Sequence, residues 1–218
     1  MAENVTKADR TRLRIIEASL PLFLEKGYNG TSMRDLMAAS GVKAGNFYFH
    51  FDSKKALALA VMDEAEGIFF DVMNATCEAE GLSPTQKLGA MMGALAALIE
   101  ARNCAGGCLF ANFALEMSDA DAELRERTAA FFERWRLMVE KLVRDARREG
   151  ELPSNIDSSG FSEYIIMALE GGIMLSRLKR DAAPLKFAFS TLRDHIFSLR
   201  KNQQGRAIKG KLLKKFSL

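Results

Sequence analysis

Apolar side chains recur every three or four residues along most of the chain, which is the spacing that places them on one face of a helix. No stretch alternates apolar and polar residues as a half-buried strand would, and no hairpin dipeptide joins two such stretches. The pattern therefore predicts an all-α fold. Its longest example covers 121–149, where the apolar stripe comprises Leu124, Thr128, Phe131, Trp135, Met138 and Leu142.

Glycine, proline and hydroxyl residues divide this pattern into about nine helices. Gly27 and Gly41 are placed to end two early helices, and the pair Thr31-Ser32 offers an N-cap for the helix between them. Pro84 suits the first residue of a later helix, because its ring presets the helical backbone angle there. The helices are expected to run up to Gly27 and then over 33–39, 43–49, 53–75, 84–102, 109–117, 121–149, 158–178 and 184–200.

Composition and charge narrow the class of protein. The 218 residues are 48% hydrophobic, which is ample for a buried core, and three cysteines are too few for a disulfide scaffold. Two histidines and these cysteines form no zinc-ligand set, so no metal and no cofactor is expected. The net charge of +3 is uneven: residues 1–60 and 201–218 are basic, and the stretch between them is acidic. A basic head suits a polyanionic partner.

The sequence also bears on location. Residues 1–10 are polar and lack the apolar region of a signal peptide. The longest apolar run, 90–99, is about half of what a membrane-spanning helix needs. We expect a cytoplasmic protein without a membrane partner.

The two short helices around Gly41 predict a helix-turn-helix, whose second helix enters the major groove of DNA. Within that helix Gly45 leaves room for close approach, Lys43 suits a phosphate or a guanine edge, and Asn46 suits a base edge. Tyr48 and His50 can donate hydrogen bonds to phosphates. The predicted DNA-binding set is Thr31, Ser32, Arg34, Lys43, Ala44, Gly45, Asn46, Tyr48, His50 and Lys54.

Residues 41–57, GVKAGNFYFHFDSKKAL, closely resemble the recognition region of the TetR/AcrR family of bacterial regulators, and residues 23–32, FLEKGYNGTS, are similar to the segment before it. The resemblance implies a helix-turn-helix DNA-binding domain at 1–55 and a helical ligand-binding and dimerisation domain at 56–202. The basic tail, 203–218, is expected to be disordered. The implied function is a repressor that a small-molecule inducer releases from a pseudopalindromic operator, with no enzymatic activity.

Two positions depart from the family pattern. Lys43 precedes the small Ala44, where the family often has the reverse order, and Phe49 stands where histidine or another polar aromatic residue is more usual. Phe47 and Phe51 are expected in the core whatever the domain binds. A helix-turn-helix that only packs is the alternative interpretation.

The last two long helices, within 158–200, are predicted to form a homodimer. Their broad apolar faces include the small residues Ala168, Gly171 and Gly172, which permit close approach, and two such helices per subunit make a four-helix bundle. The alternative is that these faces only bury the core of the monomer.

Apolar and sulfur-containing side chains between residues 60 and 180 are candidates for an inducer pocket, because methionine adapts to apolar ligands. The alternative is again an ordinary core. The candidates are Phe69, Met73, Met92, Cys108, Phe113, Met117, Trp135 and Met138.

Cys108 carries a more specific hypothesis. The stretch around it resembles a subgroup of the family that includes electrophile- and oxidant-sensing repressors, and a predicted helix start can lower a thiol pKa. One known sensor type pairs its cysteine with a lysine of the penultimate helix, where this chain has Arg177 with Lys179 nearby. Since an arginine cannot perform that covalent chemistry, a buried structural cysteine is the favoured alternative.

Two other classes of function are alternatives to a DNA-binding regulator. An enzyme is disfavoured because the two histidines are far apart in sequence and neither a Gly-x-Ser-x-Gly elbow nor a Gly-rich phosphate loop is present. A membrane-surface protein is suggested only by residues 209–216, which mix lysines with apolar residues. Liposome sedimentation with and without 203–218 would distinguish that class.

Overall fold

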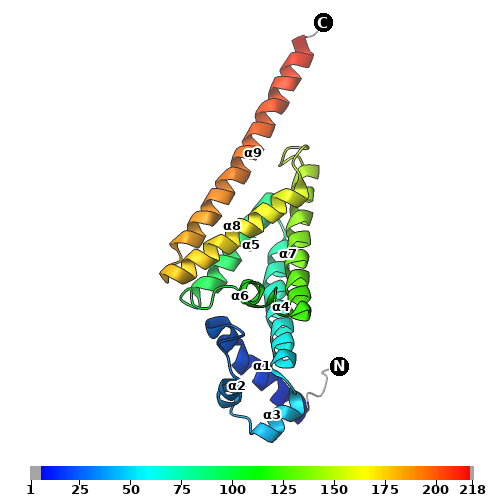
Figure 1. Cartoon of the computed structure of the whole chain (residues 1–218). Coiled ribbons are helices and arrows are strands. Elements are labelled where there is room, and N and C mark those ends of the chain that lie inside the picture. The colour runs from blue at the N-terminus through cyan, green and yellow to red at the C-terminus, as the bar shows by residue number, and fades with distance from the viewer. Residues whose placement is uncertain (1–5, 217–218) are drawn as a thin grey trace. The chain divides into compact units, whose positions relative to one another are not determined.

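The computed structural model describes the backbone of residues 6–216 and the side chains of residues 6–199. Within this part every element is a helix, which confirms the predicted all-α class of about nine helices (Figure 1). The helices are α1 (Lys7–Lys26), α2 (Met33–Ser40), α3 (Ala44–His50), α4 (Lys54–Glu78), α5 (Pro84–Glu100), α6 (Leu109–Met117), α7 (Ala122–Arg148), α8 (Ser158–Lys179) and α9 (Ala183–Phe216).

The predicted residues at which the early helices begin and end are confirmed. Gly27 and Gly41 follow α1 and α2 with φ angles of 73° and 63°, which residues with a side chain rarely adopt. Ser32 caps α2, and its hydroxyl accepts a hydrogen bond from the backbone N–H of Asp35. Pro84 begins α5, and the Ser53 hydroxyl accepts from the N–H of Ala56 in the first turn of α4. Local chemistry therefore sets these helix ends.

The last helix is the main difference from the prediction. The segment 203–218 was expected to be disordered, whereas α9 continues to Phe216. Gly205 and Gly210 each cost a helix only about 1 kcal/mol relative to alanine, and lysine, leucine, glutamine and arginine around them favour a helix. The structure does not describe the side chains of residues 209–216, which suggested membrane association.

The chain divides into two compact units. The first contains the chain up to Asp71 together with Cys104–Phe131, and the second contains Val72–Asn103 together with the chain from Phe132. Thus α4 and α7 contribute residues to both units. This division describes packing, and the functional boundaries at residues 55 and 202 stay a prediction.

The first unit is built around a small apolar core. Ile15 and Phe23 of α1, Leu36 of α2, Phe47 of α3 and Leu57 of α4 are all fully buried. Each of the first four helices therefore has a side chain in this core. Burial of a large apolar side chain stabilises a fold by about 1.5–3 kcal/mol, so these contacts hold the short helices α2 and α3 in place.

In the second unit, α8 and α9 pack side by side (Figure 1). Gly172 of α8 lies directly against α9, since a Cβ atom there would be 3.1 Å from the Cα atom of Leu185. The Ser176 hydroxyl accepts a hydrogen bond of 3.1 Å from the N–H of Leu185. The small residue and the buried hydroxyl together fix how closely the two helices approach.

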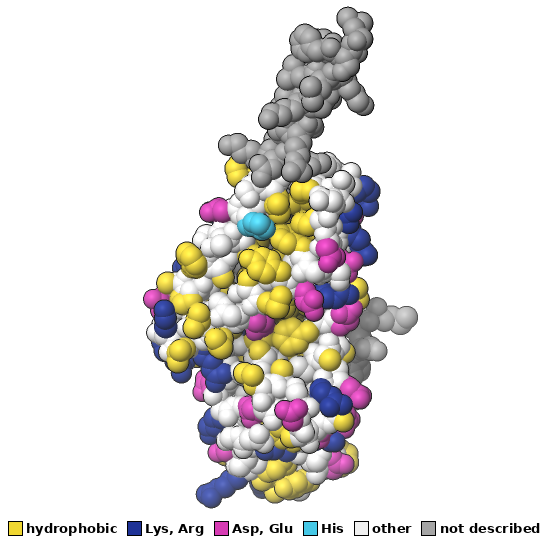
Figure 2. Space-filling view, turned by 45° about the horizontal axis from the view of Figure 1, so that its top comes forward, with side chains coloured by type: hydrophobic (Ala, Val, Ile, Leu, Met, Phe, Trp, Pro, Cys, Tyr) yellow, Lys and Arg dark blue, Asp and Glu magenta, His cyan; other side chains and the backbone are white. Residues whose placement is uncertain are grey.

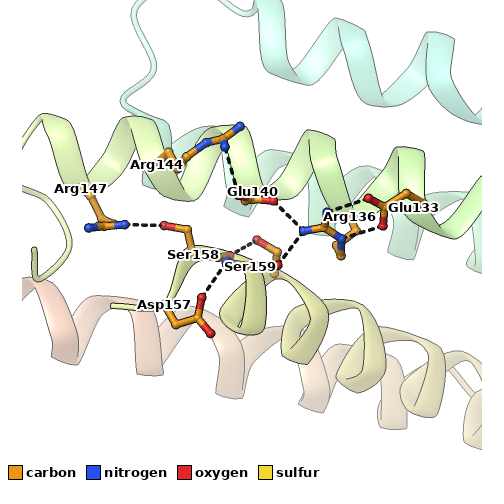
Figure 3. A network of polar contacts seen from close by, with 9 residues as sticks. Glu133, Arg136, Glu140, Arg144, Arg147, Asp157, Ser158 and Ser159 are labelled. Atoms are coloured by element: carbon orange, nitrogen blue, oxygen red, sulfur yellow. Dashed lines mark hydrogen bonds and ion pairs between the residues drawn. The ribbon is translucent and has the colours of Figure 1, made fainter. Parts of the chain in front are cut away.

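A polar network joins α7 to the start of α8 (Figure 3). Arg136 donates to Glu133 and Glu140 of its own helix, and it also donates to the Ser159 hydroxyl at 2.8 Å. About three turns further along α7, Arg147 donates to the Ser158 hydroxyl at 3.0 Å. These bonds hold the N-terminal end of α8 against α7.

Among the described residues, no helix combines the length and the apolar character that a membrane-spanning segment needs.

Candidate nucleic-acid interface

The segment from α2 to α3 has the geometry of a helix-turn-helix. After α2, Gly41 adopts the left-handed conformation, and its N–H donates to the carbonyl oxygens of Met37 and Ala38 at 3.1 and 3.3 Å. The chain thereby turns within Gly41, Val42 and Lys43 before α3 begins. The turn is therefore tight and glycine-dependent, as the sequence predicted.

Helix α3 has one buried face and one exposed face. Phe47 is fully buried. Val42, just before the helix in the sequence, and Phe51, just after it, are also buried. The Arg12 guanidinium lies 5.2 Å from the centre of the Phe51 ring and covers it. Because the core holds α3 by one face only, its other face is open to a partner.

Most of the predicted DNA-binding residues lie on the surface of this segment. His50 is half-buried, with its ring 5.1 Å from the Phe49 ring in an edge-to-face arrangement. Ser32 is exposed but engaged, since its hydroxyl both caps α2 and donates to the Asp35 carboxylate. The exposed members are Ser32, Arg34, Lys43, Ala44, Gly45, Asn46 and Tyr48.

Two predicted DNA contacts instead serve the interior of the first unit. Thr31 is fully buried, and its hydroxyl donates to the Gly27 carbonyl oxygen at 2.6 Å. The Lys54 ammonium donates to the carbonyl oxygens of Tyr28 and Thr31 at 2.9 and 3.0 Å and lies 4.2 Å from the centre of the Tyr28 ring. Both side chains fasten the loop between α1 and α2, and we do not assign them to DNA.

The same loop is held by a residue that the sequence did not single out. Glu116 of α6 accepts hydrogen bonds from the backbone N–H groups of Tyr28 and Asn29 at 3.2 and 2.8 Å. Gly27 makes this possible, because a Cβ atom there would lie 1.9 Å from a Glu116 carboxylate oxygen. Close by, the Asn112 amide donates to the Leu24 carbonyl oxygen at 3.1 Å. We call Glu116 with the N–H groups of Tyr28 and Asn29 the Glu116 clamp.

Ion pairs add a further contact in the first unit. Lys55, at the start of α4, lies 2.8 Å from a carboxylate oxygen of Glu123 and 3.3 Å from one of Asp121. The hydrogen bond to Glu123 raises the pKa of Lys55 above its ordinary value, and the one to Asp121 adds to the effect. Arg127 pairs with Asp63 and Glu66 in the same way. These pairs hold α4 to the start of α7.

The candidate pocket residues divide between the units. In the first unit Phe113 is a core residue, since its ring packs against Phe23 and Tyr28 at 5.9 and 5.7 Å. In the second unit Met138 borders a hollow of about 450 Å³ that Cys77 also lines. Phe69, Cys108, Phe113 and Met117 belong to the first unit, and Met73, Met92, Trp135 and Met138 belong to the second.

Cys108 stands where it was predicted, at the start of a helix. It is the N-cap of α6, it is half-buried, and it forms no disulfide. Cys77 in the second unit is also half-buried, and burial raises the pKa of its thiol. No group of three or more His, Cys, Asp or Glu side chains gathers as a metal site would within the described residues.

Two family models match this chain. Residues 15–61, which contain the helix-turn-helix, match the model described as bacterial regulatory proteins, tetR family. Residues 84–192 match the model of the tetracyclin repressor-like C-terminal domain. The chain belongs to the TetR family. Its members are non-enzymatic DNA-binding proteins, so this protein is a DNA-binding transcriptional regulator and not an enzyme.

Individual relatives support the assignment over most of the chain. A TetR regulator from Chloroflexus aurantiacus J-10-FL is 32% identical, with a TM-score of 0.81 over 87% of this chain and 96% of the other. A TetR regulator from Cytophaga hutchinsonii is 26% identical, with a TM-score of 0.80 over 91% and 98%. The repressor DhaR of Mycobacterium sp. strain GP1 is 26% identical over 80% of this chain and 86% of its own length.

Proposed function

We propose that this TetR regulator is a homodimeric repressor that binds a pseudopalindromic operator through α3. The observation that carries the proposal is the division of α3 into a buried face around Phe47 and an exposed face with Lys43, Asn46 and Tyr48. These side chains offer a cation, an amide and a phenol, which suit phosphates and base edges in a major groove. Repression is supported by relatives that are named repressors, DhaR among them.

Exposed apolar side chains support a dimer through α8 and α9. Met167, Met174 and Leu178 follow one another along α8 at spacings of seven and four residues, so they share one stripe of the helix. Phe187 and Phe197 are exposed on α9. Figure 2 shows hydrophobic side chains gathered on the face that carries these helices. A second copy that covered this surface would bury it with two-fold symmetry.

The proposed inducer is a small molecule that acts through the C-terminal part of the chain. Support comes from the match to the tetracyclin repressor-like C-terminal domain and from the hollow beside Met138. The inducer must bind a DNA-incompetent arrangement of the dimer more tightly than the competent one. Helix α4 is the proposed lever, because it begins directly after the helix-turn-helix and ends at Glu78, which borders the hollow.

An electrophilic or oxidising inducer is the more specific form of this proposal. It is supported by Cys108 at the N-terminal end of α6, where the helix dipole favours a thiolate. A thiol reagent should then release the wild-type protein from its operator and leave Cys108→Ser bound. Cys77→Ser is the matched control, and it should respond to the reagent as the wild type does. Equal release of Cys108→Ser would exclude a Cys108 sensor.

The central experiment measures binding of the full-length protein to duplex DNA from the flanks of its own gene. A scrambled duplex of equal length is the control, and binding is followed by fluorescence anisotropy across a salt series. We expect tight binding to the native duplex only, and a several-fold loss of affinity in Lys43→Ala and in Tyr48→Ala. Lys141→Ala on α7 should bind like the wild type.

If both duplexes bind equally and with steep salt dependence, the next step is selection from a random duplex pool, because the operator could then lie elsewhere in the genome. Failure of the full-length protein to enrich any sequence would contradict the proposal. Enrichment of a two-fold symmetric sequence would support both the operator and the dimer.

A further inference from the structure

Phe49 is an apolar side chain without an apolar environment. Its side chain is 77% exposed, although it lies between two core phenylalanines, Phe47 and Phe51. The core of the first unit therefore does not use Phe49. Single exposed apolar residues are common on protein surfaces. The exposure of Phe49 is therefore informative only together with its position on α3.

The helix places Phe49 on the face that points away from the core. At 3.6 residues per turn, Gly45 and Phe49 each lie about 160° from Phe47, on either side of the direction opposite to it. The two residues are four apart and hence neighbours on the exposed face. The central strip of that face is therefore a glycine followed one turn later by a phenylalanine.

Gly45 has no reason within the chain to be a glycine. A Cβ atom there would meet no other atom within 4 Å, and Gly45 is absent from the residues with positive φ. A glycine inside a helix costs about 1 kcal/mol relative to alanine. The gap it leaves beside the Phe49 ring lets an external surface reach the backbone of α3 and the side of the ring together.

We propose that Phe49 reads the C5-methyl group of a thymine in each half-site of the operator, an inference that rests on the proposed DNA-binding function. A phenyl ring has no hydrogen-bond donor, so it cannot select among the polar groups of the major groove. The thymine methyl is the apolar group that base edges present there, and phenylalanine is one of the side chains that contact it. Phe49 thus complements the polar Lys43 and Asn46 on the same helix.

The test uses the operator recovered with the full-length protein from a random duplex pool. Each thymine of a half-site is replaced in turn by deoxyuridine, which pairs identically and lacks the methyl group. At one position per half-site we expect the wild type to bind roughly fourfold more weakly, and roughly fifteenfold when both half-sites are changed. Phe49→Ala should bind the thymine and uracil duplexes equally.

Control variants distinguish a specific loss of the preference for thymine from a general loss of DNA binding. Leu115→Ala removes an apolar side chain that is 84% exposed on α6, and it should keep the full preference for thymine. Phe49→Leu keeps an apolar side chain and should keep part of the preference for thymine. Thermal unfolding of each variant should match the wild type, because Phe49 contributes nothing to the core.

The outcomes distinguish the two proposals. If an operator is recovered but no thymine methyl affects binding, or if Phe49→Ala keeps the same preference, the inference about Phe49 is wrong and the DNA-binding function stands. If the pool yields no enriched sequence, the proposed function fails and the inference fails with it. Loss of the methyl preference in Phe49→Ala alone assigns the contact to this ring.

Discussion

Two exposed surfaces of this protein differ in the chemistry that they offer. On α3 a cation, an amide and a phenol surround a single exposed phenylalanine, and the helix is only seven residues long. On α8 and α9 the exposed residues Met167, Met174, Leu178 and Phe187 are large and apolar. A mixed surface suits a polyanion that is read by its polar edges, whereas an apolar surface suits a second apolar surface.

The two surfaces also differ in how they are held in place. Helix α3 depends on a buried phenylalanine and on the polar contacts of the first unit that fix the loop before α2, in particular Lys54 and the Glu116 clamp. Helices α8 and α9 are held by close packing at Gly172 and by the network at Arg136. Substitutions of Lys54 or Glu116 should therefore disturb the surface on α3 by loosening the loop that holds it. A polar or charged residue placed on the surface of α8 and α9 should instead disturb that surface where it is introduced.

The largest effect is expected from a charge in the apolar stripe of α8. In Met174→Asp each copy of the protein would bury a carboxylate at the proposed dimer surface, which carries a large desolvation cost. We expect the dimer dissociation constant to rise at least a hundredfold, measured by light scattering across a dilution series, and operator binding to fall with it. Leu137→Asp, an exposed leucine of α7, is the matched control and should remain dimeric.

A smaller effect is expected where the first surface is supported. Glu116→Ala removes the acceptor of two backbone N–H groups and should lower the free energy of unfolding by about 1–2 kcal/mol, measured by urea denaturation. Glu116→Gln keeps one acceptor oxygen and should lose less. Dimerisation should not change in either variant, and a shift in the dimer dissociation constant would contradict the separation of the two surfaces.

Gly27 provides an independent check of the Glu116 clamp. Gly27→Ala places a methyl group against the Glu116 carboxylate at a backbone φ of 73°, and it should destabilise the fold by about 1–3 kcal/mol. In the Glu116→Ala background the steric part of this cost disappears and only the backbone strain remains. Additive effects of the two substitutions would show that the clamp is not formed in solution.

The next effect concerns α3 itself. Lys43→Ala removes one exposed cation from the proposed DNA surface, so operator affinity should fall several-fold and the slope of log affinity against log salt should drop by about one. Lys179→Ala, in the last turn of α8, is the control on the second surface. An unchanged salt slope in Lys43→Ala would remove this residue from the phosphate contacts.

The smallest effect is the pH dependence that Asp35 contributes to the stability of the first unit. The Ser32 hydroxyl donates to Asp35 at 2.7 Å and lowers the pKa of that carboxyl below 3.8, with a further contribution from the Ser32 backbone N–H. A depressed folded-state pKa means that this stabilisation is fully present above about pH 4 and is lost as the pH falls through the folded value. Asp35→Asn should show a smaller loss of stability than the wild type between pH 5 and pH 3 in urea denaturation, because it lacks this contribution.

Local features made much of the fold predictable. The helix ends at Gly27, Gly41 and Pro84 follow from the backbone preferences of single residues, and the buried Phe47 follows from the helical period. The same reasoning identified α6 with the bounds that the structure shows. These features need no knowledge of distant parts of the chain, which is why the sequence alone sufficed.

Features that depend on distant partners were not predictable in this way. Lys54 was expected on DNA, but its ammonium finds two carbonyl oxygens more than twenty residues earlier in the chain. Glu116 contacts N–H groups almost ninety residues away, and its only local signal was a carboxylate near the end of an apolar helix. A lysine or glutamate side chain reaches in any direction, so three-dimensional packing decides which partner it finds.

The shortness of α3 limits how much information the protein can take from base edges. Seven residues span about 10 Å of helix, which corresponds to roughly three base pairs at 3.4 Å each. Two copies would specify about six base pairs, a combination that recurs by chance about once in four thousand positions. A genome offers on the order of a million or more competing sites. In the proposed dimer, the spacing of the half-sites and the deformability of the DNA between them would therefore supply much of the selectivity.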